Sequence, residues 1–256
     1  MDLKLKVLTY NIHKGFPLHR RKYVLAEMRQ AIRSTKADLV LLQEILGHHP
    51  KEEQDSLGEM ETSSQLEYLA DTIWTHFAYG KNAVYTSNNH GNALLSRYPI
   101  IRWENIDIST NRYEKRGLLH AEVGLPDWKS RFHVLCVHLD LTEKGRQKQV
   151  QQIIRRVKQN IAADEPLILA GDFNDWLKNL CEDFERELGL REAYSLCHGQ
   201  CAKTFPSWWP LLSLDRIYIR GFEVSQAEVI SDSEWRDLSD HRPLAADLIL
   251  PQKPER

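Results

Sequence analysis

Short apolar segments that end in polar residues recur along the whole chain and alternate with stretches of helical period. Residues 3–10 alternate polar and apolar side chains, which predicts a strand with one buried face. Residues 37–43 form a nearly continuous apolar run, as expected of a strand buried on both faces. Between them, residues 20–35 repeat apolar side chains at helical spacing, so a helix is predicted there.

The same alternation continues to the end of the chain. Further strands are predicted over residues 92–96, 100–108, 117–123, 132–139, 166–170, 214–219, 223–230 and 244–250. Further helices are predicted over residues 65–74, 144–158 and 177–188. No Pro/Gly/Ser-rich linker and no repeat interrupts this pattern, so we expect one domain over residues 1–256 with a layered α/β architecture.

Composition and charge narrow the class of protein. A hydrophobic content of 42% with 27% charged residues is typical of a globular protein. No uncharged stretch is long enough to span a bilayer, and the first residues lead directly into a strand, so we predict a cytoplasmic protein. The net charge of −2 gives no general attraction to nucleic acid, and the basic residues of 144–158 fall mostly on the solvated face of a helix.

Two segments bear on the substrate. Residues 47–64 are polar and acidic, which suits a flexible segment or a rim over a site and argues mildly against a long nucleic-acid track. Residues 207–212, Ser-Trp-Trp-Pro-Leu-Leu, would suit stacking on a base, insertion into a bilayer surface, or packing before the next strand. Packing is slightly favoured.

Polar clusters follow several of the predicted strands. Asn11 ends the first strand and Glu44 ends the apolar run 39–42, where a strand would hold each side chain rigidly. After residues 167–170, Asp172 and Asn174 share one face of an extended backbone while Phe173 points away. Each cluster alone is an ordinary turn or cap, but carboxylate and amide oxygens are also the ligands that Mg²⁺ prefers.

Three further residues complete the pattern. Asp215 lies inside a predicted strand, where a carboxylate needs a partner, and His241 in Ser239-Asp240-His241-Arg242-Pro243 is a suitable one. His138 ends the apolar run 134–137. Together the clusters indicate metal-assisted hydrolysis of a phosphate ester, which needs a cation, an oriented water and groups that stabilise phosphoryl charge.

These clusters, in this order, resemble the endonuclease/exonuclease/phosphatase superfamily. The similar segments are Tyr10-Asn11-Ile12, Gln43-Glu44, His138-Leu139-Asp140, Gly171-Asp172-Phe173-Asn174, Leu214-Asp215-Arg216-Ile217 and Ser239-Asp240-His241-Arg242-Pro243. Residues 91–97 and 204–207 resemble the bacterial YbhP-like subgroup. The resemblance covers nearly the whole chain and implies a four-layer α/β sandwich of two packed mixed sheets flanked by helices.

The resemblance also implies a metal site and roles for individual residues. Glu44 would be the principal metal ligand, assisted by Asn11 and Asp240, and the ion would be Mg²⁺, with Mn²⁺ as an alternative. The catalytic set would comprise Asp172 as the group that orients or deprotonates water, Asn174 beside it, His241 charged and held by Asp215, and His138 at the phosphate or leaving group. Arg116 and Asn92 would contact the substrate.

Two positions depart from the patterns of relatives. His13 stands where apurinic endonucleases carry an Asp near the metal, and His90 stands where pancreatic-type nucleases carry a Glu that supports the counterpart of His138. Neither departure touches Glu44, Asp172 or His241.

The resulting hypothesis is a Mg²⁺-dependent hydrolase that cuts phosphodiester bonds by in-line attack of a water oriented by Asp172. The alternatives are a phosphomonoesterase for an inositol phosphate or another small phosphorylated molecule, and an inactive binding module. Because Glu44, Asp172 and His241 are all present, the active enzyme is favoured. The substrate class (nucleic acid, phospholipid or small molecule) stays open, and no segment indicates a protein partner.

Overall fold

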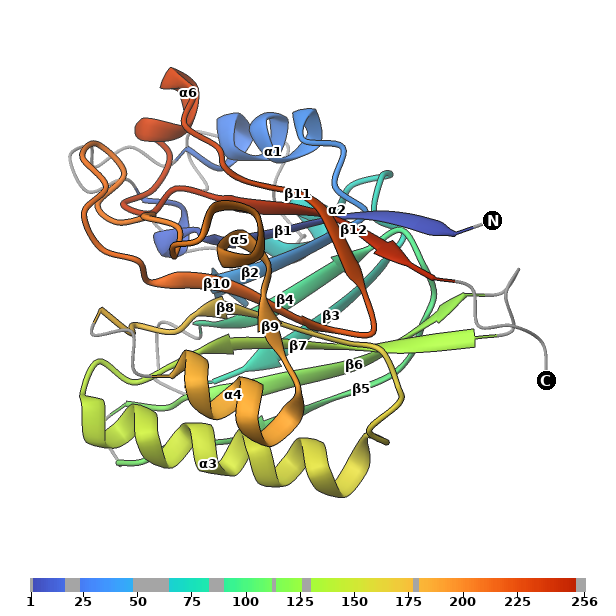
Figure 1. Cartoon of the computed structure of the whole chain (residues 1–256). Helices are drawn as coiled ribbons and strands as arrows, with labels where there is room; N and C mark the ends of the chain where they lie inside the picture. The colour runs from blue at the N-terminus through green and yellow to red at the C-terminus, as the bar shows by residue number, and fades with distance from the viewer. Residues whose placement is uncertain are drawn as a thin grey trace.

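Two mixed β-sheets of six strands each pack face to face, with helices on both outer faces (Figure 1). The structure is a computed structural model of the chain and describes residues 2–16, 24–47, 65–82, 90–111, 114–125, 130–176 and 180–251. The first sheet has the order β11-β12-β1-β2-β4-β3, with the bounds Glu223–Val229, Leu244–Leu250, Leu3–Asn11, Leu39–Leu46, His90–Ser96 and His76–Lys81. The second has the order β5-β6-β7-β8-β10-β9, with the bounds Ile100–Asp107, Gly117–Leu125, Ser130–His138, Leu167–Asp172, Asp215–Arg220 and Arg191–Glu192.

The helices form the two outer layers. Helices α1 (Leu25–Ser34) and α2 (Gln65–Ala70) pack on the first sheet, and α3 (Glu143–Asn160) and α4 (Cys181–Leu188) pack on the second. A short α5 (Ala193–His198) contacts β10 and β11, and α6 (Ser233–Arg236) and a 3-10 turn (His13–Gly15) complete the described elements. None of the helices in the described ranges combines the length and the apolar character needed to cross a bilayer.

Three apolar clusters hold these layers together. Between the sheets, Val7 and Leu41 of the first sheet belong to the same buried cluster as Val134 and Ile168 of the second. A second cluster joins the first sheet to α1 and α2, and a third joins the second sheet to α3 and α4. Burial of both faces of each sheet explains the long apolar runs in the sequence. The predicted four-layer sandwich is confirmed.

Most predicted elements exist, with shifted ends. The strand over 244–250 is confirmed in full, whereas β2 continues past the predicted 37–43 to Leu46, and α2 stops four residues before 74. Residues 17–23, 48–64 and 177–179 lie outside the described part, so the acidic segment and two predicted helix starts are not tested. The sequence reading missed β3, a short edge strand whose alternation is weakened by Gly80.

The expected packing of residues 207–212 before the next strand is wrong for most of this segment. Packing was slightly favoured for it, but Trp208, Trp209 and Leu211 are 54%, 63% and 58% exposed. The chain turns back on itself, because Phe205 pairs with Leu212 in an isolated bridge. The tip between these two residues is therefore directed away from the core.

One end of the sandwich collects the polar strand ends. Each sheet contains one parallel pair, β1 with β2 and β7 with β8, and parallel neighbours require a crossover, which α1 and α3 supply. The carboxyl ends of these four strands and the starts of β10 and β12 meet opposite the N-terminus, at the left of Figure 1. Such an end is where α/β sheets commonly bind ligands.

A histidine pair on the outer face of the second sheet predicts how stability depends on pH. His120 Nε2 lies 3.0 Å from His133 Nδ1, and burial together with the charges of His133 and Arg156 lowers the pKa of His120 to about 4. The unfolded chain binds a proton on this imidazole below about pH 6.5, and the folded protein does so only near pH 4. Stability is therefore lost as the pH falls through this window.

We expect the melting temperature of His120→Gln to fall less than that of the unaltered protein between about pH 7 and about pH 5. Scanning calorimetry measures both. His76→Gln, on the edge strand β3, controls for the loss of a histidine elsewhere. Equal pH slopes for all three proteins would show that the buried pair is not the cause.

Candidate active site

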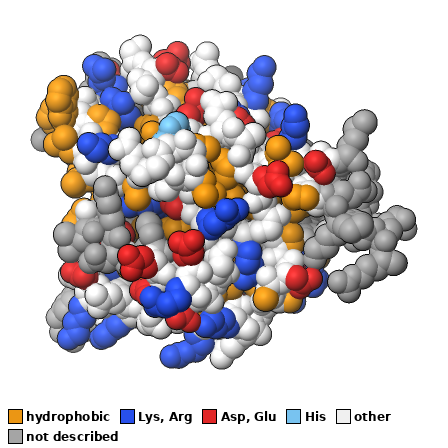
Figure 2. Space-filling model, in the orientation of Figure 1, with side chains coloured by type: hydrophobic (Ala, Val, Ile, Leu, Met, Phe, Trp, Pro, Cys, Tyr) orange, Lys and Arg blue, Asp and Glu red, His pale blue; other side chains and the backbone are white. Residues whose placement is uncertain are grey.

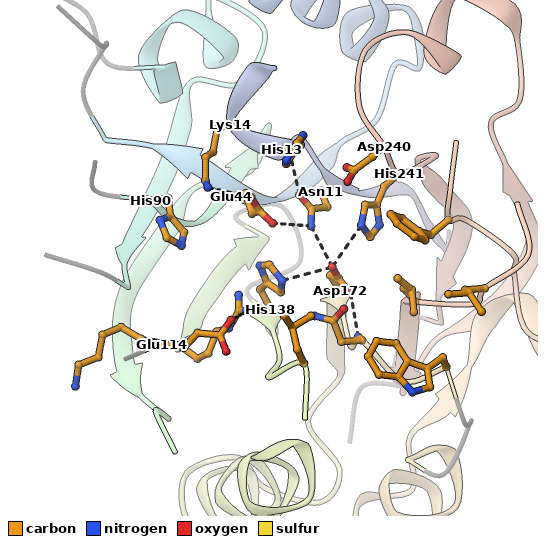
Figure 3. Close-up of a pocket in the computed structure, with 18 residues that line it drawn as sticks. Asn11, His13, Lys14, Glu44, His90, Glu114, His138, Asp172, Asp240 and His241 are labelled. Carbon is orange, nitrogen blue, oxygen red and sulfur yellow. Dashed lines mark hydrogen bonds and ion pairs between the residues drawn. The ribbon is translucent and has the colours of Figure 1, made fainter. Parts of the chain in front are cut away.

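A cavity of about 510 Å³ opens at the end of the sandwich where the strand ends meet (Figure 3). Both sheets contribute to its wall. Its lining residues are Asn11, His13, Lys14, Glu44, His90, Glu114, Lys115, Arg116, His138, Leu141, Asp172, Asn174, Trp176, Phe205, Leu212, Leu214, Asp240 and His241. The cavity thus has a charged floor and several apolar side chains at its edge.

The structure brings most of the predicted site residues to this cavity. Eight of them line it: Asn11, Glu44, Arg116, His138, Asp172, Asn174, Asp240 and His241. Asp215 lies behind His241, fully buried. In the third predicted motif, His138 faces the cavity, whereas Asp140 accepts from the N–H and hydroxyl of Thr142, the residue that caps α3.

Asn92 lies elsewhere. Its side chain is fully buried, and its Nδ2 donates to the carbonyl oxygens of Gly117 and Cys136 at 2.9 and 3.3 Å. It does not line the cavity. Asn92 lies near the start of β4 and faces the second sheet, where its amide satisfies backbone carbonyls of β6 and β7. This geometry argues against the predicted contact with substrate.

A close approach of two backbones places Asp172 at the cavity. Gly171 has a φ of 146°, and a Cβ there would lie 2.0 Å from the carbonyl oxygen of Val137. Only glycine tolerates this contact, which lets β8 run tightly beside β7 up to its last residue. Phe173 then points into the core, where it contacts Phe184 and Tyr218, while Asp172 and Asn174 face the cavity as predicted.

The Asp172 carboxylate is the centre of the hydrogen-bond network. Its Oδ2 accepts from Asn11 Nδ2 at 3.0 Å, and its Oδ1 accepts from the backbone N–H of Asn174 at 2.9 Å. Two imidazoles flank it, with His138 Nε2 at 3.5 Å and His241 Nε2 at 3.7 Å from Oδ2. Burial raises the pKa of Asp172, although the charge of His241 opposes this effect.

His241 is held between two carboxylates. Its Nδ1 lies 2.8 Å from Asp215 Oδ2, and Thr204 Oγ1 donates to the same oxygen at 2.6 Å. Burial disfavours the imidazolium, but the charges of Asp215 and Asp172 outweigh burial and raise the pKa of His241 to about 10. The imidazole is therefore charged at neutral pH. Phe205 packs beside it, with ring centroids 5.0 Å apart.

His138 has the opposite charge state. It is buried, and burial together with the nearby charges of Arg116 and His241 holds its pKa well below the ordinary value. The ring is therefore neutral at pH 7. Arg116 is itself buried and pairs with Glu114 at the cavity wall. The site thus offers one charged and one neutral imidazole on either side of Asp172.

Glu44 reaches the cavity from a bulge in β2. The pairing of β2 with β4 shifts between Leu42 and Ile45, and Glu44 adopts a left-handed φ of 57°. Its carboxylate oxygens lie 3.4 Å from Asn11 Nδ2 and 3.9 Å from Lys14 Nζ. Neither contact is a short hydrogen bond, so the carboxylate keeps lone pairs for another ligand.

The donor set at this wall fits a divalent cation. Glu44 and Asp240 are half-buried carboxylates that line the same cavity, and Mg²⁺ is commonly bound by one or two carboxylates while it keeps several waters. The amide of Asn11 has its nitrogen toward Glu44, and its oxygen accepts from the N–H of His13 at 3.0 Å. Asn11 as a direct ligand stays a prediction.

A second group of potential ligands suits a metal less well. Asp172, Asp215 and His241 each have one ligand atom within 4.8 Å of the others. Nδ1 of His241 is already occupied by Asp215, and a protonated imidazole has no lone pair for a metal. This trio is better described as a buried ion-pair cluster.

Several lining residues were not identified as site residues from the sequence. They are His13, Lys14, His90, Glu114, Lys115, Leu141, Trp176, Phe205, Leu212 and Leu214. For His13 and His90 a signal existed, because each stands where relatives carry an acidic residue. Phe205 and Leu214 belong to segments that carry the family resemblance, but nothing in the sequence marked them as lining a site. The others lie outside these segments, and only the folded chain brings them to one wall.

Backbone strain is concentrated at the cavity. Six non-glycine residues in the described part have a positive φ, and four of these line the cavity: His13, Lys14, Glu44 and Asn174. Such conformations cost free energy and persist only where surrounding structure enforces them. Their clustering indicates that the fold aims particular side chains into this space.

Comparison with known proteins adds an independent finding. The sequence model of the Endonuclease/Exonuclease/phosphatase family matches residues 8–241. The uncharacterized protein YbhP of Escherichia coli (strain K12) is 44% identical over 249 residues, which cover 97% of this chain and 98% of YbhP.

Solved structures with the same fold include two of low sequence identity. An endonuclease/exonuclease/phosphatase from Beutenbergia cavernae has a TM-score of 0.77 at 22% identity and covers 96% of this chain and 72% of its own. The catalytic domain of human Nocturnin with a bound sulfate anion has a TM-score of 0.75 at 16% identity and covers 97% and 96%. At these identities the matches show a shared fold alone.

The two carboxylates around His241 lead to a spectroscopic prediction. We expect Asp215→Asn to lower the pKa of His241 from about 10, because one carboxylate is lost while burial remains. ¹⁵N imidazole chemical shifts recorded against pH in metal-free protein measure this pKa. Asp247→Asn, on the following strand β12, is the matched control. A His241 pKa that is the same in all three proteins would contradict the assigned cause.

Proposed function

This chain belongs to the Endonuclease/Exonuclease/phosphatase family, and we propose that it is a divalent-metal-dependent hydrolase of phosphodiester bonds. The observation that carries the proposal is the Asp172 carboxylate, which lies at the cavity wall between a charged and a neutral imidazole. A carboxylate of raised pKa is suited to take a proton from water, and a fixed imidazolium is suited to stabilise negative charge on a phosphoryl oxygen.

The family and the donor set support a bound Mg²⁺, with Mn²⁺ as an alternative. Glu44 and Asp240 would hold it, with Asn11 beside them, and the ion would supply charge neutralisation at the phosphoryl oxygens. Asn11 Nδ2 contacts both Glu44 and Asp172, at 3.4 and 3.0 Å. Asn11 thereby fixes the distance between the metal-binding wall and the proton acceptor.

The remaining steps follow from the side chains. Asp172, held by Asn11 and by the N–H of Asn174, orients a water and accepts its proton as the water oxygen bonds to phosphorus. The bond from phosphorus to the leaving oxygen breaks in line, and this oxygen keeps the electron pair and takes a proton from solvent water. His241, kept charged by Asp215, stabilises the charge on the phosphoryl oxygens, and neutral His138 hydrogen-bonds the phosphate or the leaving oxygen.

One observation favours the second candidate, a phosphomonoesterase. Lys14, Lys115 and Arg116 add positive charge to the cavity wall, which suits the extra negative charge of a monoester. Glu114 pairs with Arg116 and Glu44 lies beside Lys14, so part of this charge is offset within the site. We therefore rank the diesterase first.

A hydrolysis screen tests the mechanism. The substrates are a generic soluble phosphodiester, a phosphomonoester, single- and double-stranded DNA, RNA and phospholipid, each with Mg²⁺ or Mn²⁺. We expect diester hydrolysis that falls by about 10²- to 10⁴-fold in Asp172→Asn, because the amide accepts no proton. Equal rates for both proteins on every substrate would refute the role of Asp172. A rate higher on the monoester would favour the second candidate.

A thermal-shift experiment tests the metal site without an activity readout. An ion that binds the folded state raises the melting temperature, so we expect Mg²⁺ to stabilise the EDTA-treated protein. Glu44→Gln should abolish most of this shift, because it removes the carboxylate charge while keeping the side-chain size. Glu67→Gln, on α2, is the control. A shift as large in Glu44→Gln as in the control would exclude Glu44 as a ligand.

A further inference from the structure

The loop between α5 and β10 exposes an apolar tip that packing does not explain. Trp208 and Trp209 are 54% and 63% exposed, and Leu211 and Leu212 are 58% and 37% exposed. Single exposed apolar side chains are normal on a protein surface, but four within five residues form a patch of the kind that marks an interaction site. Figure 2 shows hydrophobic side chains protruding at the upper left of the molecule, on the side where this loop lies in Figure 1.

The tip is held in place by hydrogen bonds. Phe205 O accepts from the N–H groups of Leu211 and Leu212, each at 2.8 Å, and Phe205 N donates to Leu212 O at 3.2 Å. Below the tip, Ser207 N donates to Asp240 O at 2.7 Å, and Arg242 Nε donates to Ser207 O at 2.6 Å. The exposed side chains are therefore presented on a fixed scaffold, which limits the entropy lost when they dock.

The same loop forms part of the catalytic wall. Thr204 Oγ1 donates to Asp215, and Phe205 packs on His241. Phe205 and Leu212 both line the cavity, whereas Trp208 and Trp209 do not. A surface that receives the tip would consequently lie at the mouth of the cavity, beside the charged imidazole.

Apolar side chains also border the cavity at α3 and β8. Leu141, just before α3, is 53% exposed, and Trp176, after β8, is 40% exposed; both line the cavity. Arg146 lies over the Trp176 ring at 4.9 Å and holds it in place. The cavity therefore has a charged interior and an apolar rim on two sides. A molecule that carries a phosphate next to hydrocarbon chains matches both parts.

Positive charge accompanies the apolar tip. Ser207 O accepts from the Arg242 guanidinium, and Ser207 Oγ donates to the backbone carbonyl oxygen of Arg236. The Arg236 guanidinium also lies near that of Arg242, because burial and then the charge of Arg236 lower the pKa of Arg242. Arg236 is exposed and Arg242 is half-buried. Tryptophan at the level of the head groups, leucine below it and arginine around it is the pattern by which a peripheral protein binds an anionic bilayer.

We propose that the loop 204–212 docks the protein onto an anionic phospholipid bilayer and that its substrate is a phospholipid, whose head-group phosphodiester enters the cavity past Leu212 and Trp176. The identity of the substrate rests on the function proposed above, and the docking does not. Leucines at positions 141, 211 and 212 offer no ring for base stacking, which favours a lipid over single-stranded nucleic acid.

Vesicle co-sedimentation tests the docking in EDTA, where no hydrolysis is expected. The probes are vesicles of phosphatidylcholine alone and of phosphatidylcholine with phosphatidylglycerol. We expect the full chain to sediment with the anionic vesicles and the double variant Trp208→Ser/Leu211→Ser to bind at least about tenfold more weakly, because it loses two inserted apolar side chains. Arg236→Glu should weaken binding to the anionic vesicles in particular.

The matched control is Trp103→Ser/Ile101→Ser on the edge strand β5. Its side chains are 49% and 59% exposed, close to those of the test pair, and neither lines the active-site cavity. We expect it to bind vesicles as the unaltered protein does. Melting temperatures establish whether each variant is folded. If a double variant does not fold, Arg236→Glu, a change at an exposed position, still tests the docking.

Three results would overturn the proposal: no binding of the unaltered protein to anionic vesicles, equal binding by test and control variants, or binding of a single-stranded oligonucleotide that depends on Trp208 without any binding to vesicles. Hydrolysis of a soluble diester by the unaltered protein is measured in parallel. If it is absent while vesicle binding depends on Trp208, the proposed function fails and the docking stands. If it is present without vesicle binding, the docking fails alone.

Discussion

The charge of His241 between two buried carboxylates is the interaction on which this end of the molecule depends. Asp215 of β10 and Asp172 of β8 are directly paired across the second sheet, so two like charges face each other with no solvent to separate them. His241 comes from the segment before β12 of the first sheet and lies beside both. Without this cation, the two carboxylates would repel each other and one would be expected to bind a proton. His241 is charged at neutral pH, and its charge opposes the rise that burial causes in the pKa of Asp172.

Hydrogen bonds around the same carboxylate also tie the two sheets together at this end. Asn11, at the end of β1, reaches Asp172 across the sandwich, and its backbone oxygen accepts from Ser239 Oγ at 2.7 Å. The chain segment that carries His241 is therefore attached to the first sheet and hydrogen-bonded into the second. Polar contacts at this end take the place that apolar side chains hold elsewhere between the sheets. The polar side chains that line the cavity are therefore held in place by hydrogen bonds.

The amino-acid sequence alone predicted those parts of the structure that depend on apolar periodicity and on motifs. Apolar periodicity predicted a layered α/β architecture, and the resemblance to a known family implied the four-layer sandwich. The polar residues at strand ends predicted which side chains the strands would bring together. Membership of a motif did not show whether a side chain would face the cavity or be buried in the interior. Asn92 belongs to a segment that resembles relatives, yet its amide bonds to buried backbone carbonyls, and Asp140 holds Thr142, the residue that caps α3. Lys14, Trp176 and Phe205 reach the site through loop conformation, which a local pattern does not encode.

Backbone strain and surface exposure point to the same conclusion about how the cavity is built. Glu44, in the bulge of β2, and Asn174, just after the buried strand β8, adopt left-handed backbone conformations, so the packed sandwich compensates for the cost of aiming them inward. Trp208 and Trp209 are directed outward by a loop whose base is fixed by Arg242 and whose inner side chain, Phe205, supports His241. One hydrogen-bonded loop thus carries both Phe205, which packs on the charged His241, and the tryptophans that face outward. If the outer residues meet a bilayer, the orientation of the phosphate relative to Asp172 is already set before it enters the cavity.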